Sequence, residues 1–178
     1  MTGAYAAPAA HGGPQPWGPL AGWGSRVGAS LIDALVAMVP LVVYVVGIPF
    51  LVQGLPNQSF DTGTGTYHRS GPGNGAFIAV GVLLMVVGLL ASFAVLLWNR
   101  VFRQGRTGQS IGKRALGIRL VEERTGQPPG AGMTFVRELA HVLDGFFYIG
   151  YLWPLWDEKR QTFADKVVGT VVTTAPKP

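Results

Sequence analysis

The sequence has 178 residues, of which 48% are hydrophobic and 13% charged, and its formal net charge is +5. Soluble domains have about 25% charged residues, so this composition excludes an ordinary soluble domain and indicates a single membrane domain. The sequence contains no Cys, which excludes a disulfide framework and thiolate chemistry.

The N-terminal segment, residues 1–22, consists mainly of Ala, Gly and Pro and has no Asp, Glu, Lys or Arg. It offers too little apolar surface to offset the entropy of ordering the chain, so we expect a disordered tail. It also lacks the basic start and apolar stretch of a signal peptide, so the first apolar run should stay in the protein. We expect the folded membrane domain over 23–173 and a short tail over 174–178.

The first apolar run covers 27–52 and contains one charged residue, Asp33. At about 1.5 Å per helical residue it is long enough to cross about 30 Å of hydrocarbon. Pro40 and Pro49 should kink this helix or end it. We therefore predict a first spanning helix with an acidic group within it.

The second apolar run, 76–98, has no charged residue and predicts a second spanning helix. Trp98 and the following Arg100 are typical interfacial anchors. Gly81 and Gly88 put small residues on one side, where they either admit a close neighbouring helix or reflect the frequency of Gly in membrane helices. Both interpretations remain open from the sequence.

The positive charge is concentrated after the second run. Residues 99–124 contain seven basic and two acidic residues, which equals the net charge of the whole chain. Because cytoplasmic loops are rich in Lys and Arg, we place this segment and the N-terminus inside, and the nearly neutral residues 53–74 outside. The juxtamembrane basic loop should contact anionic lipid headgroups rather than nucleic acid; its residues are Arg100, Arg103, Arg106, Lys113 and Arg114.

Within this loop, GRTGQSIGKR (105–114) has some features of a phosphate-binding P-loop. The P-loop pattern requires Gly where Thr107 stands and Ser or Thr where Arg114 stands, so both ends fail. A nucleotide site is therefore not supported. We expect Gly and Ser to break the chain here, with the basic pair Lys113 and Arg114 facing lipid phosphate.

Two short segments have β-strand character. ALGIRLVEE (115–123) alternates apolar and polar residues, and KVVGTVV (166–172) is rich in β-branched residues. TGQPP (125–129) supplies a turn. If the two segments pair, they form a short cytoplasmic β-like element and must lie on the same side of the membrane.

Residues 133–156 allow two interpretations. Arg137, His141 and Asp144 share one face of an amphipathic helix, whereas 145–156 is apolar and too short to span alone. The segment is either a third spanning helix or a re-entrant segment that returns to the cytoplasmic side. The later basic residues favour re-entry. The fold class is thus a helical membrane protein with two spanning helices and this third segment.

Several of these stretches together resemble the RDD family of small bacterial membrane proteins. They are SRVGASLID (25–33), GQSIGKRALGIR (108–119), TGQPP, RELAHVLD (137–144) and DEKRQTFADKVVGTVV (157–172). The resemblance covers roughly residues 20–173 and implies a multi-pass protein of the bacterial plasma membrane.

The family is named after one Arg and two Asp. The resemblance implies that these are Arg26, Asp33 and either Asp144 or Asp165. Ala164 stands where the family often carries His, so a role that depends on this His does not transfer. The resemblance also implies a C-terminal motif made of Asp157, Gln161, Thr162, Asp165, Lys166, Gly169 and Thr170.

The charges within the apolar segments require partners. An acidic residue in the bilayer costs about 2.5–3.5 kcal/mol on insertion scales, and Arg26 lies two helical turns from Asp33 on nearly the same face. We expect Arg137 or His141 to pair with Asp33. The network of Arg26, Asp33, Arg137, His141 and Asp144 is then a buried ion-pair lock, a proton or cation site, or a subunit interface.

For function, the sequence favours a non-enzymatic accessory or assembly subunit that packs against a larger membrane complex, for example a respiratory assembly. The alternative is ion or small-solute transport by a homo-oligomer. We expect no cofactor and no metal, since His11 and His68 lie in polar, glycine-rich segments and no zinc-site spacing is present.

Overall fold

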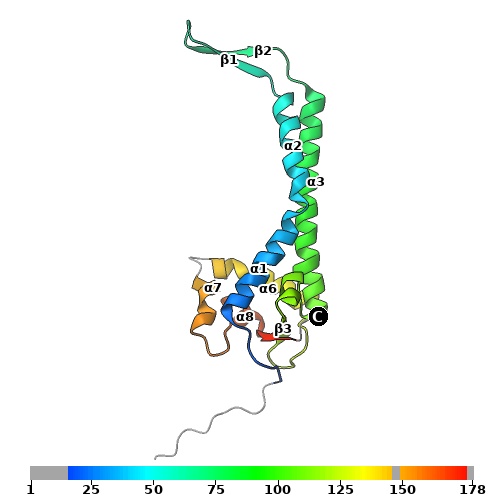
Figure 1. Cartoon of the computed structure of the whole chain (residues 1–178), viewed down its shortest axis with the longest axis vertical. Coiled ribbons are helices and arrows are strands. Elements are labelled where there is room, and N and C mark those ends of the chain that lie inside the picture. The colour runs from blue at the N-terminus through cyan, green and yellow to red at the C-terminus, as the bar shows by residue number, and fades with distance from the viewer. Residues whose placement is uncertain (1–15, 146–148, 176–178) are drawn as a thin grey trace, which may run out of the picture.

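The computed structural model describes residues 16–145 and 149–175. It consists of a long two-helix shaft that stands on a small base (Figure 1). The shaft is formed by α2 (Leu41–Gly54) and α3 (Gly75–Leu97). The base contains α1 and the described residues that follow α3 in the chain.

The first apolar run forms two helices. α1 (Trp23–Met38) and α2 are bent by 45° relative to each other, and the break occurs at Pro40, which cannot donate a backbone hydrogen bond. Pro49 lies inside α2. The predicted kink is therefore found at the first proline and not at the second.

The second apolar run is a single helix. α3 continues through a π-helical turn, η1 (Trp98–Arg103), into α4 (Gln104–Thr107), giving a helix of 33 residues that is long and apolar enough to cross a membrane. The described residues contain a second span only if the bent pair α1 and α2 counts as one. Gly108 ends the helix with a φ of 74°, a conformation that favours Gly.

Three glycines bring the two shaft helices into backbone contact. A Cβ atom at Gly81 would lie 2.5 Å from the backbone nitrogen of Leu51, and one at Gly88 would lie 2.5 Å from that of Tyr44. Gly47 faces the carbonyl oxygen of Gly81 in the same way, at 2.6 Å. Of the two interpretations of these glycines, close helix packing is the one that the structure supports.

The segment between the shaft helices is a hairpin, although the sequence predicted only a polar loop. β1 (Asn57–Asp61) pairs antiparallel with β2 (Thr66–Ser70) at the end of the shaft farthest from the base (Figure 1). The Asp61 side chain accepts a hydrogen bond from the backbone N–H of Gly63 at 2.8 Å, and Gly65 has a φ of 67°. A short Gly-rich turn with this chemistry is typical of hairpins.

The two segments with β-strand character pair as predicted. β3 (Ile118–Glu122) lies antiparallel to β4 (Thr170–Thr174), with Leu120 opposite Val172. These two side chains pack with Ile118, Ala21 and Ala29 in the core of the base. The prediction was wrong for residues 166–168, which end α8 (Phe163–Val168) before Gly169 turns the chain with a φ of 63°.

Residues 16–22 lie within the predicted disordered tail, but they pack against this sheet. Trp17 is 7% exposed, and its ring nitrogen donates to the backbone oxygen of Glu123 at 2.9 Å. Ala21 donates its N–H to the oxygen of Val172 at 2.9 Å. The folded part therefore begins before residue 23. At the other end, Thr174 completes β4. Residues 1–15 and 176–178 lie outside the described residues.

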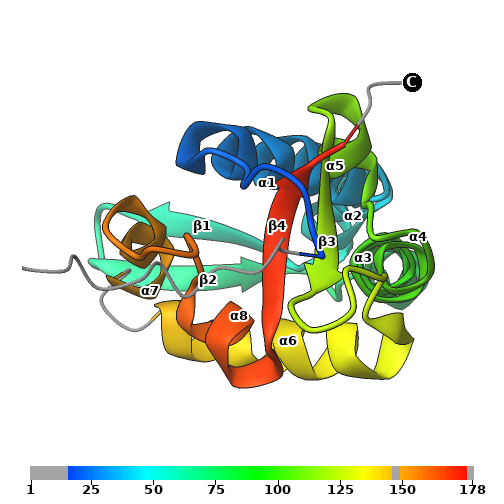
Figure 2. The ribbon, with the colours of Figure 1, turned by 90° about the horizontal axis from the view of Figure 1, so that it is seen from below.

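Among the described residues of 133–156, no helix is long and apolar enough to cross a membrane. In the view along the shaft, α3 is seen end-on and α6 (Gly130–Gly145) lies across it (Figure 2). α7 (Ile149–Leu152) and the 3-10 turn η3 (Trp153–Leu155) follow; residues 146–148 lie outside the described residues. The re-entrant segment stays a prediction; what the structure shows is a helix that lies flat, across the direction of the shaft (Figure 2).

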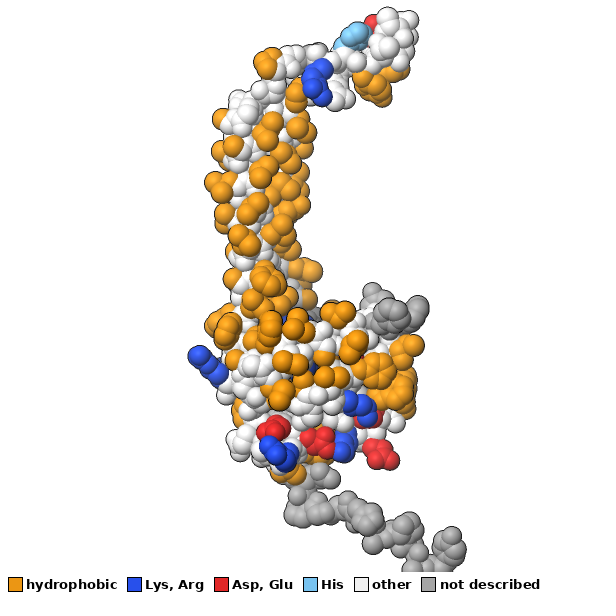
Figure 3. Space-filling view, turned by 180° about the vertical axis from the view of Figure 1, so that it is seen from behind, with side chains coloured by type: hydrophobic (Ala, Val, Ile, Leu, Met, Phe, Trp, Pro, Cys, Tyr) orange, Lys and Arg blue, Asp and Glu red, His pale blue; other side chains and the backbone are white. Residues whose placement is uncertain are grey.

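One face of α6 is apolar and uncovered. Leu139, Val142 and Leu143 are 58%, 75% and 55% exposed, whereas Arg137 and Asp144 on the opposite face are buried. Hydrophobic side chains cover the shaft and the adjoining part of the base, and charged side chains gather at the far end of the base (Figure 3). The hydrophobic part of the base therefore lies next to the shaft, and the charged part lies away from it.

Candidate functional site

Three carboxylates are buried in the base. Asp33 is 3% exposed, and Asp144 and Asp165 are 0% exposed. Buried carboxylates require hydrogen-bond donors or positive charges, so each was traced to its partners.

Asp165, in the first turn of α8, is held by two arginines. It accepts hydrogen bonds from Arg137 Nε at 2.8 Å and from Arg26 Nη1 at 3.1 Å. Its backbone and side chain also form a capping box with Thr162. Burial alone would raise the pKa of Asp165, but Arg137 and Arg26 outweigh it and hold this pKa well below its usual range.

Asp144, near the end of α6, caps the start of α8. Its Oδ1 accepts from the backbone N–H of Phe163 at 2.8 Å, and its Oδ2 lies 2.6 Å from Nδ1 of His141. Burial and the nearby Arg137 lower the pKa of His141 despite this carboxylate. His141 therefore joins the network mainly as a neutral hydrogen-bond donor.

Asp33, on α1, is bound by neutral donors. Its carboxylate accepts from Asn99 Nδ2 at 2.7 Å, from Ser110 Oγ at 2.5 Å and from the N–H of Gly112 at 2.8 Å. The prediction that Arg137 or His141 pairs with Asp33 was wrong, because Arg137 binds Asp165 and His141 binds Asp144. Arg26 binds Asp165 rather than Asp33 as well.

Ser110 and Gly112 therefore bind α1 through the Asp33 carboxylate. Ser110 also accepts from Lys113 N and so caps α5 (Ile111–Ala115). A Cβ atom at Gly112 would lie 2.0 Å from the carbonyl oxygen of Ala29, so only Gly lets α5 approach α1 this closely. The sequence analysis missed Asn99 and Ser110 as partners. The available signal was that both are uncharged polar residues within the basic segment 99–124.

The C-terminal motif serves the structure of this region. Asp157 accepts from Lys166 Nζ at 2.5 Å and from the N–H of Gln161 at 2.9 Å. The Gln161 side chain donates to the oxygen of Thr170 at 2.9 Å. Thr170 in turn donates to Asp165 at 3.2 Å. These bonds fix α8 and β4, and hence the position of the Asp165 carboxylate.

The residues of the juxtamembrane basic loop have different surroundings. Arg103 donates to the oxygen of Gln109 at 2.9 Å, whereas Arg106 and Arg114 are exposed. Arg100 lies 3.4 Å from Glu138. Lys113 was expected to face lipid, but its Nζ points into the base and donates to Gln104 Oε1 at 2.5 Å.

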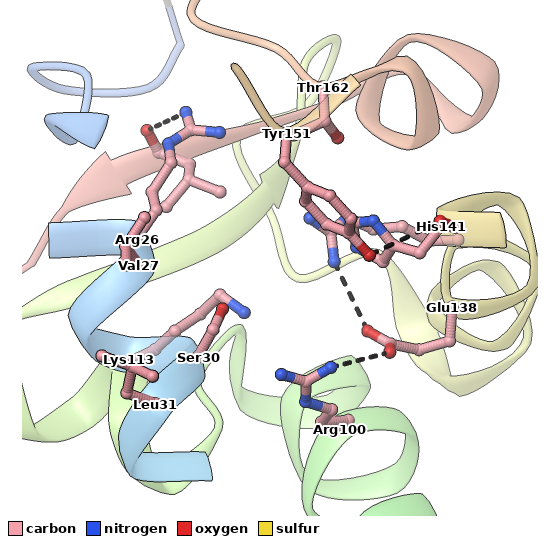
Figure 4. A pocket seen from close by; sticks show the side chains of 12 residues that line it. Arg26, Val27, Ser30, Leu31, Arg100, Lys113, Glu138, His141, Tyr151 and Thr162 are labelled. Atoms are coloured by element: carbon pink, nitrogen blue, oxygen red, sulfur yellow. Dashed lines mark hydrogen bonds and ion pairs between the residues drawn. The ribbon is translucent and has the colours of Figure 1, made fainter. Parts of the chain in front are cut away.

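Lys113 and its neighbours line a cavity of about 310 Å³ between α1, α5, α6 and α7 (Figure 4). Val27, Leu31 and Tyr151 contribute apolar surface. Ionisable side chains from four elements surround the remainder, and four of these five are basic; they are Arg26, Arg100, Lys113, Arg137 and Glu138. Burial and the charge of Arg137 lower the pKa of Lys113 from 10.5 to about 7.

The described residues contain no group of three or more His, Asp and Glu placed to hold a metal ion. The arrangement instead combines a fixed network of buried hydrogen bonds and ion pairs with a cationic cavity.

Comparison with known proteins places these features in a family. The model of the RDD family matches residues 20–169. The "Proline-rich antigen" of Mycobacterium leprae (strain TN) is 40% identical over 156 residues, which cover 84% of this chain and 59% of that protein. The "Proline-rich antigen homolog" of Mycobacterium tuberculosis (strain ATCC 25618 / H37Rv) is 48% identical over 93 residues, which cover 52% of this chain and 39% of that protein. No solved structure matches.

Proposed function

This chain belongs to the RDD family, and we propose that it is a multi-pass protein of the bacterial plasma membrane that acts as a non-enzymatic accessory or assembly subunit of a larger membrane complex.

The shaft supports the membrane placement. α3 has 23 residues, or about 35 Å at about 1.5 Å per residue, which exceeds the roughly 30 Å of hydrocarbon in a bilayer. Trp98, 53% exposed, marks its end on the side of the base, where an aromatic anchor is expected. The flat α6 then lies with its apolar face against the lipid and its polar face on the base.

The observation that carries the accessory role is the absence of a polar route through the shaft. α2 and α3 contain no charged residue, and their backbones touch at Gly47, Gly81 and Gly88. The three buried carboxylates lie in the base and are each held by fixed donors. Proton or cation coupling requires a carboxylate that exchanges its ligands, whereas these contacts favour a structural lock.

The accessory role predicts a heteromeric assembly. A tagged copy of this chain, expressed in its source organism and extracted in mild detergent, should migrate with a larger membrane complex at fixed stoichiometry. Native mass spectrometry then measures the composition. A homo-oligomer without other subunits would contradict the accessory role.

Transport by a homo-oligomer is the second candidate, and the cationic cavity is the observation that favours it. A cavity lined by Arg26, Arg100, Lys113 and Arg137 suits an anion rather than a cation. Liposomes that contain the purified chain distinguish the candidates, because the accessory role predicts no anion or cation flux above that of empty liposomes.

The membrane placement makes a topological prediction. A reporter fused after residue 60, in the β1–β2 hairpin, should be outside the cell, and a reporter fused near residue 115 should be inside. The reason is the concentration of Lys and Arg over 99–124. A Cys introduced at Glu158, which is exposed on the base, should resist impermeant reagents on intact cells. Labelling of this Cys would contradict the placement of the base.

A further inference from the structure

We propose that the cationic cavity of the base binds a phosphate group, and that its source is the headgroup of an anionic phospholipid. The cavity lies between α1, α5, α6 and α7 and has a volume of about 310 Å³. This proposal goes beyond an accessory role, and it depends on the proposed membrane placement only for the source of the phosphate.

Lys113 is the group that most needs an anion. Its Nζ donates to Gln104 Oε1, and within residues 16–145 and 149–175 no carboxylate oxygen lies within 4.0 Å of it. An ammonium group has three donors, so two remain for a ligand in the cavity. Figure 4 shows this side chain between Arg26 and Arg100, reaching toward the space that the other lining residues surround.

The arginines leave further donors available. Nη1 of Arg100 lies 3.4 Å from Oε2 of Glu138, and Nη1 of Arg137 lies 3.5 Å from Oε1 of the same carboxylate. This one carboxylate therefore pairs with two arginines, at long distances. Arg26 binds Asp165, but its buried Nε has no partner among the described residues. A phosphate group offers several acceptor oxygens and binds best to converging Arg and Lys side chains.

The apolar part of the wall indicates a lipid. Val27 and Leu31 line the cavity and are also 37% and 61% exposed on the surface of α1. Leu139 is also 58% exposed, on the same helix that contributes Arg137 and Glu138 to the cavity. A phosphate in the cavity would therefore have apolar surface beside it on which acyl chains pack, and a free phosphate would leave this surface unused.

The test measures which lipids the purified full chain retains. Native mass spectrometry of the protein in micelles doped with equal amounts of phosphatidylglycerol and phosphatidylcholine should show preferential retention of phosphatidylglycerol. Lys113→Met and Arg100→Gln should each weaken this retention about tenfold, the factor typical of losing one charge-assisted hydrogen bond. Arg114→Gln is the matched control: it removes a charge from the same helix at an exposed position outside the cavity, so its loss of retention measures only the general attraction of the basic loop for anionic lipid and should be much smaller.

A variant of opposite sign keeps the test independent of folding defects. Glu138→Gln removes the single acidic residue that lines the cavity, so retention of phosphatidylglycerol should increase several-fold. A damaged protein would not bind lipid more tightly. Thermal unfolding of each variant, followed by size-exclusion chromatography, reports whether it is folded.

Inorganic phosphate distinguishes the two sources of the ligand. Millimolar phosphate should neither stabilise the protein against heat nor displace phosphatidylglycerol. If it does both in a Lys113-dependent manner, the cavity binds phosphate as such and the assignment to lipid is wrong. Equal retention of the two lipids, or equal losses in the Lys113 and Arg114 variants, would overturn the proposal as a whole. None of these lipid-binding results bears on the proposed topology, which the reporter fusions test separately.

Discussion

Replacing Asp165 with Asn should destabilise the protein by about 3–5 kcal/mol, the range observed when one partner of a buried ion pair is removed. The carboxylate is fully buried and neutralises both Arg26 and Arg137. Asn has nearly the same shape, but it leaves Arg26 without its carboxylate partner and Arg137 with only the Glu138 carboxylate, at 3.5 Å. Denaturant-induced unfolding in detergent micelles measures the loss of stability.

Asp157→Asn is the matched control for this variant. Asp157 belongs to the same C-terminal motif and is 10% exposed, but its partner Lys166 is 44% exposed, and Asn can still accept the hydrogen bond from Gln161. The loss should therefore be clearly smaller, about 1 kcal/mol. Combining Asp165→Asn with Arg137→Met should recover part of the stability, because it removes one of the uncompensated charges. No recovery would show that the pair does not stabilise the base.

The Asp165 ion pairs also predict a pH dependence. The folded-state pKa of Asp165 lies below its unfolded value of about 3.9. Its contribution to stability is therefore fully present above about pH 4 and is lost as the pH falls through the folded pKa. Asp165→Asn should lose stability less steeply on acidification than the unmodified protein.

Replacing Asp33 should have an effect at least as large, with Leu more damaging than Asn. Leu would leave the Asn99 amide, the Ser110 hydroxyl and the Gly112 N–H without their acceptor. Each buried unpaired group costs about 1–3 kcal/mol. Asn retains one acceptor oxygen, so we expect roughly half the loss of Leu. Unfolding in micelles and the yield of folded protein measure both variants.

A double variant distinguishes this network from an ion pair. Arg137→Met should not restore the stability of Asp33→Leu, because Arg137 binds Asp165 and not Asp33. Ser110→Ala should add less to Asp33→Leu than it costs alone, since both changes affect one hydrogen bond. Asp33→Asn that folds and assembles fully but abolishes function would instead support a transport site.

The sequence predicted the elements of this protein better than their contacts. Uncharged residues over 76–98 made the long helix evident, and β-branched residues identified the strands. It predicted one network of charged residues, but in the structure Asp33 is bound by neutral donors and the arginines have Asp165 as their partner. The sequence did not assign the pairs, because Arg26 and Asp165 are 139 residues apart and hydrophobic periodicity carries no information about such contacts.

The segment 133–156 was ambiguous for a physical reason. Arg137 and Asp144 at helical spacing predict an amphipathic helix, but the apolar face of a flat helix at a membrane surface has the same composition as that of a helix buried in a bundle. The polar donors of Asp33 were missed for another reason. Asn99 and Ser110 carry no charge, and a search for salt bridges passes over neutral partners of a carboxylate.

The antiparallel pairing of β3 with β4 has a consequence for biosynthesis. Ribosomes add about 5–20 residues per second, so Asp165 is synthesised roughly 7 to 28 s after Arg26, which lies 139 residues earlier. α2 and α3 are separated only by a short hairpin, and these local contacts form early. The base closes last, after membrane insertion, when β4 reaches β3 and the N-terminal segment. A chain that stalls before this point leaves Arg26 and Arg137 without the Asp165 carboxylate.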